Sequence, residues 1–203
     1  MFYDFRNTFF QQVCFSHHQI ELVFPKFDNK NLSRWQHKGY IIKLRNGLYT
    51  FPEHLDKPGM NLYVANRIYQ PSYISLHYAL NFYGIIPEVI NRVTSVSTLK
   101  SKQFSNKLGE FSFQSVRPKL FFGYEIKRTD HWDIQMACPE KAIIDLFYLY
   151  PIYKTPEEIE NLRFDRSFLK SSINVKKLDD YQYNINNKSL SQRLELMKKV
   201  YAL

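Results

Sequence analysis

The chain has 203 residues, 44% of them hydrophobic and 23% charged, which is an ordinary composition for a folded protein of one or two domains. No run of about 18 uncharged apolar residues occurs, and residues 1–10 lack an apolar leader core, so we expect a cytoplasmic protein without a membrane span. Cys14 and Cys138 lie far apart and without Cys/His spacing, which excludes the usual zinc motifs.

The net positive charge, formally +9, is concentrated in two blocks. Residues 1–52 hold seven Lys or Arg against three Asp or Glu, and residues 90–128 hold eight against two. Residues 129–203 are balanced, with eleven of each sign. Clustered basic charge is typical of proteins that bind a polyanion, although a solvated basic surface without a partner gives the same pattern.

The first fifty residues predict three helices and then a β-hairpin, which is the order of a winged helix-turn-helix. Ser16 and Asp28 are suited to cap the second and third helices, and Gly39 is suited to end the third. Asn46-Gly47 is the strongest short signal for a tight hairpin. The expected helices are 3–12, 17–24 and 29–38, and the expected strands are 40–44 and 48–51.

The helix expected over 29–38 has one apolar and one basic face. At about 100° per residue, Leu32 and Trp35 point toward the core, and the other side carries cations and small hydrogen-bonding side chains. In a major groove, Arg pairs bidentately with guanine and Asn with adenine, so this face suits DNA reading. The predicted contact residues are Lys30, Ser33, Arg34 and His37, flanked by Asn31 and Lys38.

A two-residue hairpin turns its apolar side chains toward the helices and its cations toward solvent. Lys43, Arg45 and Thr50 are expected outside, with Asn46 at the tip. Such a basic wing can hold phosphates or enter a minor groove beside the helix, so we predict double-stranded DNA as a partner. The expected pairs are Arg45 with Leu48, Leu44 with Tyr49, Lys43 with Thr50, and Ile42 with Phe51.

Beyond a polar, Pro-containing connector at 53–59, residues 60–203 predict a second domain of class α+β, and residues 1–52 form the first. The second domain has two helices, a mostly antiparallel sheet, a helix opened by Pro139, and a helical tail. The expected elements are helices 60–69 and 75–83, strands 92–98, 111–116, 120–128 and 133–136, and helices 139–149, 157–162 and 189–202.

The central basic block predicts a second basic surface on this domain. It would either extend the DNA surface or meet an acidic or nucleic-acid partner, and the sequence leaves both open. Its residues are Arg92, Lys100, Lys102, Lys107, Arg117 and Lys119.

No catalytic motif is recognisable, and we expect no enzyme, no catalytic residue, no metal site and no cofactor. Asp130, Asp133, Glu140 and Lys141 are the residues that would suit a metal-dependent nuclease. The two aspartates flank the start of a short strand, and adjacent helix positions point about 100° apart, which disfavours a shared metal ion.

Three segments resemble the AbiEi-type antitoxin family and occur in the family's order over roughly residues 40–150. The first, Lys43 to Tyr49, is similar to a basic wing ending in Gly-x-Tyr. The second is Ser72-Tyr73-Ile74-Ser75-Leu76-His77-Tyr78-Ala79-Leu80, with Gly84 and Val93-Thr94, and the third is Cys138-Pro139-Glu140-Lys141-Ala142-Ile143-Ile144-Asp145. Tyr78 departs from the family pattern, which has a small residue there, and this predicts altered packing of that helix.

The resemblance implies an antitoxin of a type IV toxin–antitoxin system linked to abortive phage infection. Its N-terminal domain would repress the operon by binding inverted repeats in its own promoter. Its second domain would counteract a nucleotidyltransferase-like toxin, and a stable complex between the two is not required in such systems. The alternative is a winged-helix regulator whose second domain senses a ligand or a protein, and a neighbouring toxin-like reading frame would separate these two hypotheses.

In physical terms, the second and third segments predict structural roles. Ser75 is placed to cap a helix, and Glu140 lies where a helix dipole favours a negative charge. Lys141 and Asp145 are four residues apart on that helix and are expected to pair.

Overall fold

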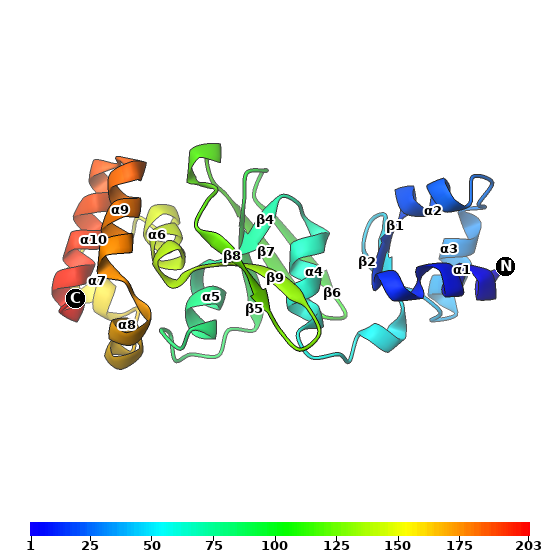
Figure 1. Ribbon diagram of the computed structural model, residues 1–203, viewed down its shortest axis with the longest axis horizontal. Coiled ribbons are helices and arrows are strands. Elements are labelled where there is room, and N and C mark those ends of the chain that lie inside the picture. Colours follow the sequence, from blue (N-terminus) through cyan, green and yellow to red (C-terminus); the bar gives the residue numbers. More distant parts are fainter.

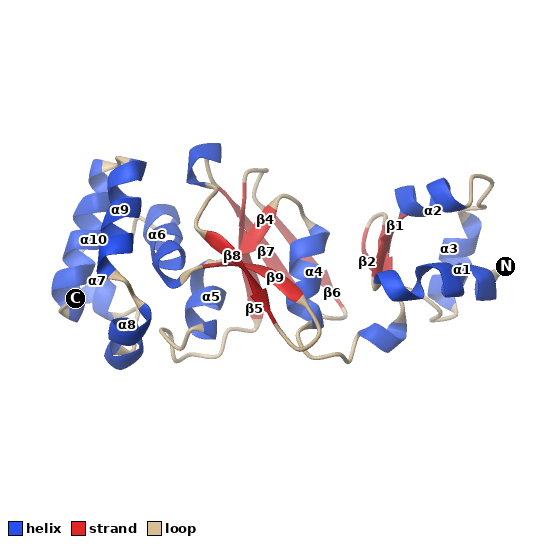
Figure 2. Cartoon of the chain, in the orientation of Figure 1, coloured by secondary structure: helices blue, strands red, loops and turns tan.

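The structure, a computed structural model, describes residues 1–203, and its parts follow one another along the long axis (Figure 1). A small N-terminal unit stands at one end, a sheet with flanking helices forms the middle, and a group of helices completes the chain. The two termini lie at opposite ends (Figure 1). The class is α+β, as predicted, with helices and mixed sheets (Figure 2).

The N-terminal unit packs three helices against an antiparallel sheet of order β1-β3-β2. Ser16 caps α2 as predicted, because its Oγ accepts from Gln19 N at 3.2 Å while Gln19 Oε1 accepts from Ser16 N at 2.7 Å. Aromatic rings fill the core, where the ring of Phe5 lies 4.7 Å from Trp35 and 5.4 Å from Phe15. The elements are α1 (Phe2–Phe9), β1 (Cys14–Ser16), α2 (His17–Val23), α3 (Lys30–His37), β2 (Ile42–Arg45) and β3 (Leu48–Thr50).

A six-stranded sheet of order β6-β7-β5-β4-β9-β8 forms the middle of the molecule. Three neighbouring pairs are antiparallel, but β5–β7 and β4–β9 are parallel, so the prediction of a mostly antiparallel sheet holds only in part. The β5–β7 pair is parallel because β6 takes the outer edge and β7 returns between it and β5. The strands are β4 (Ser72–Ile74), β5 (Arg92–Ser97), β6 (Lys102–Asn106), β7 (Gly109–Ser115), β8 (Tyr124–Arg128) and β9 (Asp133–Ala137).

Helices cover both faces of this sheet. Helix α4 lies on the side of the N-terminal unit, and α5 and α6 lie on the side of the tail (Figure 1). Pro139 is the first residue of α6, as predicted. None of the helices is both long and apolar enough to cross a membrane. They are α4 (Met60–Ile68), α5 (Leu76–Phe82), α6 (Pro139–Leu149), α7 (Pro156–Glu160), α8 (Arg166–Ser172), α9 (Val175–Ile185) and α10 (Lys188–Tyr201).

Several elements were absent from the sequence prediction. Strands β1 and β4 have three residues each, which is too short for an alternating pattern to be recognised. Strand β6 is a largely polar edge strand, and its exposed residues do not show the pattern of a half-buried strand. Helices α8 and α9 belong to the tail that was expected to be helical only in general terms.

The hairpin formed by β2 and β3 joins the N-terminal unit to the middle of the molecule. Tyr49 and Phe51 pack into the small aromatic core, as predicted. Leu44 and Leu48 instead belong to the large core of the second part of the chain. The prediction that Leu44 packs on the N-terminal helices is therefore wrong, and the hairpin has one apolar contact surface in each core.

Candidate nucleic-acid interface

Helix α3 is held in place by its apolar face and by an aspartate at its start. Leu32 and Trp35 are buried, and the ring of Trp35 lies 4.9 Å from Phe2 on α1. Asp28 Oδ1 accepts a hydrogen bond from Lys30 N at 2.9 Å, which satisfies one of the free N–H groups at the helix start. These contacts turn the opposite face of α3 toward solvent.

The solvent face of α3 is basic, as the helical wheel predicts. Arg34 is the only cation on it with an ion pair, to Asp28 Oδ2 at 3.4 Å. The Arg34 side chain is 64% exposed, so this pair is weak and can be exchanged for a phosphate or a base edge. The exposed residues of this face are Lys30, Ser33, Arg34, His37 and Lys38.

Asn31 does not flank that face, contrary to the prediction. It is only 7% exposed, and its Nδ2 points at Met1 Sδ, 3.8 Å away. The reason is helical geometry: Asn31 precedes Trp35 by four residues, and side chains at i and i+4 share one face of a helix. Its predicted role in reading adenine is therefore incompatible with its position.

The hairpin exposes its cations as predicted, but part of the pairing between its two strands differs from the predicted register. Arg45 pairs with Leu48 as expected, but a bulge at Leu44 shifts the pairs beyond it by one residue. Gly47 has a φ of 74°, the left-handed conformation that a tight hairpin turn of this kind requires. The exposed residues of the hairpin are Lys43, Arg45 and Asn46.

Thr50 is fully buried, although it was expected to face solvent. The prediction considered the two strands of the hairpin alone, whereas β1 pairs with β3 and places Cys14 opposite Thr50. The hydroxyl of Thr50 donates to the carbonyl of Val13 at 2.6 Å, so its polar group is satisfied inside the protein.

The six residues of the predicted second basic surface are all exposed, but the structure does not gather them into one patch. The strand ladder places Arg92 and Lys107 near the start of β7, whereas Lys102 lies opposite Phe113 near its end. Seven residues of β7 span roughly 20 Å. Lys100, Arg117 and Lys119 lie beyond the ends of these strands, and Arg92 is neutralised by Glu110, with Nε 2.8 Å from Oε2.

One end of that basic block contacts the hairpin directly. Asn106 Nδ2 donates to the carbonyl oxygen of Leu44 at 3.1 Å, so the turn between β6 and β7 lies against the bulge of β2. Lys107 follows Asn106 in that turn, and Lys43 and Arg45 flank Leu44. The turn that carries Lys107 therefore lies next to the strand that carries Lys43 and Arg45.

The second and third motifs of the resemblance meet in a buried polar network. Lys141 pairs with Asp145 as predicted, and both side chains are almost completely buried. Tyr73 and Ser75 donate their hydroxyl protons to Asp145 Oδ2 at 2.9 and 2.7 Å, and Lys141 Nζ donates to the Tyr73 hydroxyl oxygen at 2.9 Å. Burial raises the pKa of Asp145, while Lys141 and the two hydroxyl groups act in the opposite direction.

This network is structural, because no solvent reaches it. A side chain at Gly123 would bring its Cβ to 3.0 Å from Lys141 Cγ, so the backbone closes directly over the lysine. Ser75 stands at the N-cap of α5 as predicted, but its hydroxyl serves Asp145. Thr94 provides the cap instead, since its Oγ1 accepts from Tyr78 N at 3.1 Å and donates to Ser75 O at 2.7 Å.

The residues of the nuclease alternative serve separate contacts. Asp133 Oδ1 lies 3.3 Å from Arg128 Nε. Glu140 accepts from Asn174 N at 2.8 Å and pairs with Lys177 at 3.2 Å, which ties α6 to α9. Burial acts to raise the pKa of Glu140, but the hydrogen bond from Asn174 N and the other donors bring it below its usual value. No group of three His, Cys, Asp or Glu side chains is arranged to hold a metal ion.

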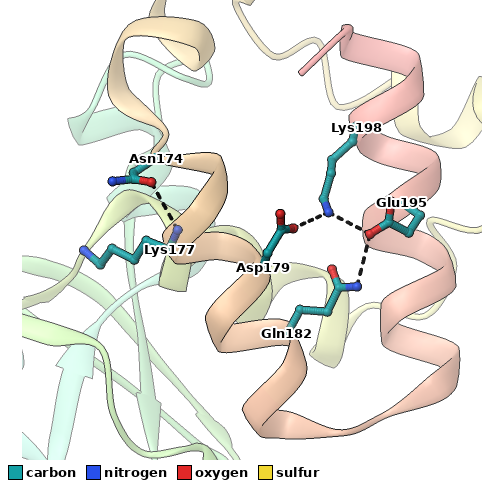
Figure 3. Close-up of polar contacts among 6 residues, drawn as sticks. All are labelled: Asn174, Lys177, Asp179, Gln182, Glu195 and Lys198. Carbon is teal, nitrogen blue, oxygen red and sulfur yellow. Dashed lines mark hydrogen bonds and ion pairs between the residues drawn. The ribbon is translucent and has the colours of Figure 1, made fainter.

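Polar contacts also join the last two helices of the tail, as Figure 3 shows. Lys198 on α10 pairs with Asp179 on α9 and with Glu195 Oε1 at 2.7 Å, and Gln182 Nε2 donates to the same Glu195 oxygen at 3.1 Å. No sequence motif marks these residues. They fasten α9 to α10 at the end of the molecule farthest from the hairpin (Figure 1).

No protein-family model matches the chain, and a search of curated proteins finds no match. The features that bear on function are therefore the exposed cations of α3 and the hairpin, and the residues of the three motifs.

Proposed function

We propose that this protein is a DNA-binding transcriptional autorepressor and the antitoxin of a type IV toxin–antitoxin system. Its N-terminal unit acts as a winged helix-turn-helix, with α3 as the recognition helix and the β2–β3 hairpin as the wing. The unit binds inverted repeats in the promoter of its own operon. The rest of the chain counteracts a nucleotidyltransferase-like toxin.

One observation carries the DNA-binding part of the proposal. Two neighbouring elements, α3 and the hairpin, each bury an apolar side and expose cations, of which only Arg34 has a carboxylate partner. The element order α1-β1-α2-α3-β2-β3 and the sheet order β1-β3-β2 support the winged-helix assignment. A helix with exposed Arg and Lys side chains fits the major groove, and a basic hairpin beside it fits the flanking phosphates.

The antitoxin part of the proposal is supported by the three motifs. The first supplies the basic hairpin, and the other two supply the buried network around Lys141 and Asp145, which holds β4 and α6 together. Residues with such a role maintain the architecture of the second domain.

Binding to promoter DNA tests the first part. The purified protein is titrated by fluorescence anisotropy against the DNA upstream of its own reading frame and against a scrambled duplex, at two salt concentrations. Tight and promoter-selective binding is expected. Weak, unselective binding that disappears with added salt would refute autorepression. It would mean that the basic residues form only a surface that attracts any polyanion.

Co-expression tests the second part. A toxin-like reading frame next to this one should arrest growth when expressed alone, and this protein should restore growth. Rescue by a variant expected to bind DNA only weakly, Arg34→Ala with Lys43→Ala, would separate neutralisation from repression. If no neighbouring frame is toxic but promoter binding is selective, the alternative holds: a winged-helix regulator with a sensing second domain.

A further inference from the structure

A cleft of about 590 Å³ lies between the N-terminal unit and helix α4. Both parts of the chain contribute to its walls. Gln12, Ser16 and Gln19 come from the N-terminal unit, Arg45 comes from the hairpin, and Arg67 and Gln70 come from the end of α4 and the turn after it. The cleft therefore exists only while the N-terminal unit and α4 are packed against each other.

The cleft carries uncompensated positive charge. Its walls include two guanidinium groups and no carboxylate, and neither Arg45 nor Arg67 forms an ion pair anywhere in the structure. Arg67 lies over the ring of Tyr63, with its Cζ 5.1 Å from the ring centroid, which orients the guanidinium without neutralising it. Cys14 also lines the cleft, and because burial raises the pKa of its thiol to about 12, it adds no negative charge near neutral pH.

The donors in the cleft suit a phosphoryl group better than a carboxylate. A guanidinium binds two oxygens of a phosphate in a fork, and two guanidinium groups match the charge of a phosphoryl dianion. A carboxylate carries a single negative charge and would compensate only one of the two guanidinium groups. Gln12 Oε1 accepts from Gln19 Nε2 at 3.2 Å, so the amide N–H groups of Gln12 stay free to donate to a third oxygen.

We propose that this cleft binds a phosphoryl group between Arg45 and Arg67. The group comes either from a free phosphorylated molecule or from the backbone of DNA bound to the hairpin, and the recognition chemistry is the same in both cases. The DNA source rests on the proposed function. The free-ligand source does not, so the two can succeed or fail independently.

Free ligands are tested first, by isothermal titration calorimetry with inorganic phosphate, pyrophosphate and AMP. The proteins are the wild type, Arg67→Gln, and Lys176→Gln as a matched control, because Lys176 is an exposed, unpaired lysine on α9. Saturable binding to the wild type and to the control is expected for at least one probe. Its affinity should fall about tenfold or more in Arg67→Gln and recover in part in Arg67→Lys.

The indole N–H of Trp132 reports where the probe binds. The ring of Trp132 lies 4.7 Å from that of Tyr63, on which Arg67 rests, and its N–H donates to Pro58 O at 2.8 Å. An anion captured by Arg67 should shift the NMR signal of this N–H and leave that of Trp35 unchanged. The reverse pattern would locate the anion on α3 and overturn the assignment of the cleft.

If no free probe binds, the DNA arm decides. Binding of the upstream duplex is measured over a range of salt concentrations. A backbone phosphate held by Arg67 predicts that the slope of log K against log salt falls by about one in Arg67→Gln and stays unchanged in Lys176→Gln. The proposal is overturned if free probes do not bind and Arg67→Gln leaves this slope unchanged. If the wild type does not bind DNA at all, the free probes alone decide, and their failure to bind overturns it.

Discussion

Replacement of Lys141 by methionine removes the only cation of the buried network. Methionine fills a similar volume and keeps the apolar part of the side chain, so the main change is the loss of the ammonium group. Asp145 is then left with two hydroxyl donors, Tyr73 and Ser75, and no positive charge within reach. The variant therefore tests whether the network stabilises the fold through the ion pair.

The expected cost follows from burial. The Lys141 side chain is 0% exposed and that of Asp145 is 2% exposed, so solvent cannot replace the lost partner. Breaking a buried ion pair by removing one member typically costs about 3–5 kcal/mol, because an uncompensated charge stays inside. We expect the free energy of unfolding of Lys141→Met to fall by about that amount near pH 7.5.

The loss should depend on pH. Burial raises the pKa of Asp145, and Lys141 opposes this effect in the wild type, so the shift is larger in the variant. A carboxyl group whose folded-state pKa is raised contributes stability that is complete below its unfolded pKa and lost as pH rises through the folded value. The destabilisation of Lys141→Met should accordingly be smaller near pH 5 than near pH 7.5.

Urea unfolding followed by far-UV circular dichroism measures the effect at both pH values. The matched control is the double variant Lys141→Met with Asp145→Asn, in which no charge stays buried and the amide oxygen still accepts from the hydroxyl groups. It should be more stable than Lys141→Met alone near pH 7.5. A loss below about 1 kcal/mol for Lys141→Met, or a double variant no more stable than the single one, would refute the argument.

Three further predictions concern exposed or reactive groups. Arg34→Ala should weaken promoter binding by roughly 1–3 kcal/mol in an anisotropy titration, whereas Asn31→Ala, at a buried position, should leave the affinity of the folded protein unchanged. Lys43→Ala should weaken binding to promoter and scrambled DNA equally and lower the salt slope by about one. Because burial raises the pKa of Cys14 to about 12, alkylation of its thiol by iodoacetamide should be slow near pH 7 and become fast on unfolding in urea; rapid alkylation of the folded protein would contradict this.

The local patterns of the N-terminal unit could be predicted from the sequence because short-range physics determines them. The capping box at Ser16, the Asn46-Gly47 turn and the apolar side of α3 each depend on residues a few positions apart. The prediction failed where a distant segment decides the environment. Thr50 is buried because β1, three residues long and far away in the sequence, pairs with its strand.

The same distinction explains the second part of the chain. The pairing of Lys141 with Asp145 was predictable because the two residues are one helical turn apart. The contribution of Ser75 was misassigned, because its hydroxyl bonds to a carboxylate seventy positions later and Thr94 caps the helix in its place. The strand order could not be predicted for the same reason, because the parallel β4–β9 pair joins two segments that no local sequence pattern relates.

The β2–β3 hairpin packs against both parts of the molecule. One side of it packs Tyr49 into the small aromatic core, and the other packs Leu44 and Leu48 into the large one. Asn106 holds the Leu44 carbonyl, so the cations beside Leu44 have a position set by the second part of the chain as well as by the first. A wing fixed in this way cannot move relative to α4 without breaking apolar contacts of the large core. Any partner that alters the docking of the two parts must therefore also change where Lys43 and Arg45 point, and this would give the second part of the chain a direct physical means to influence the DNA binding that we propose.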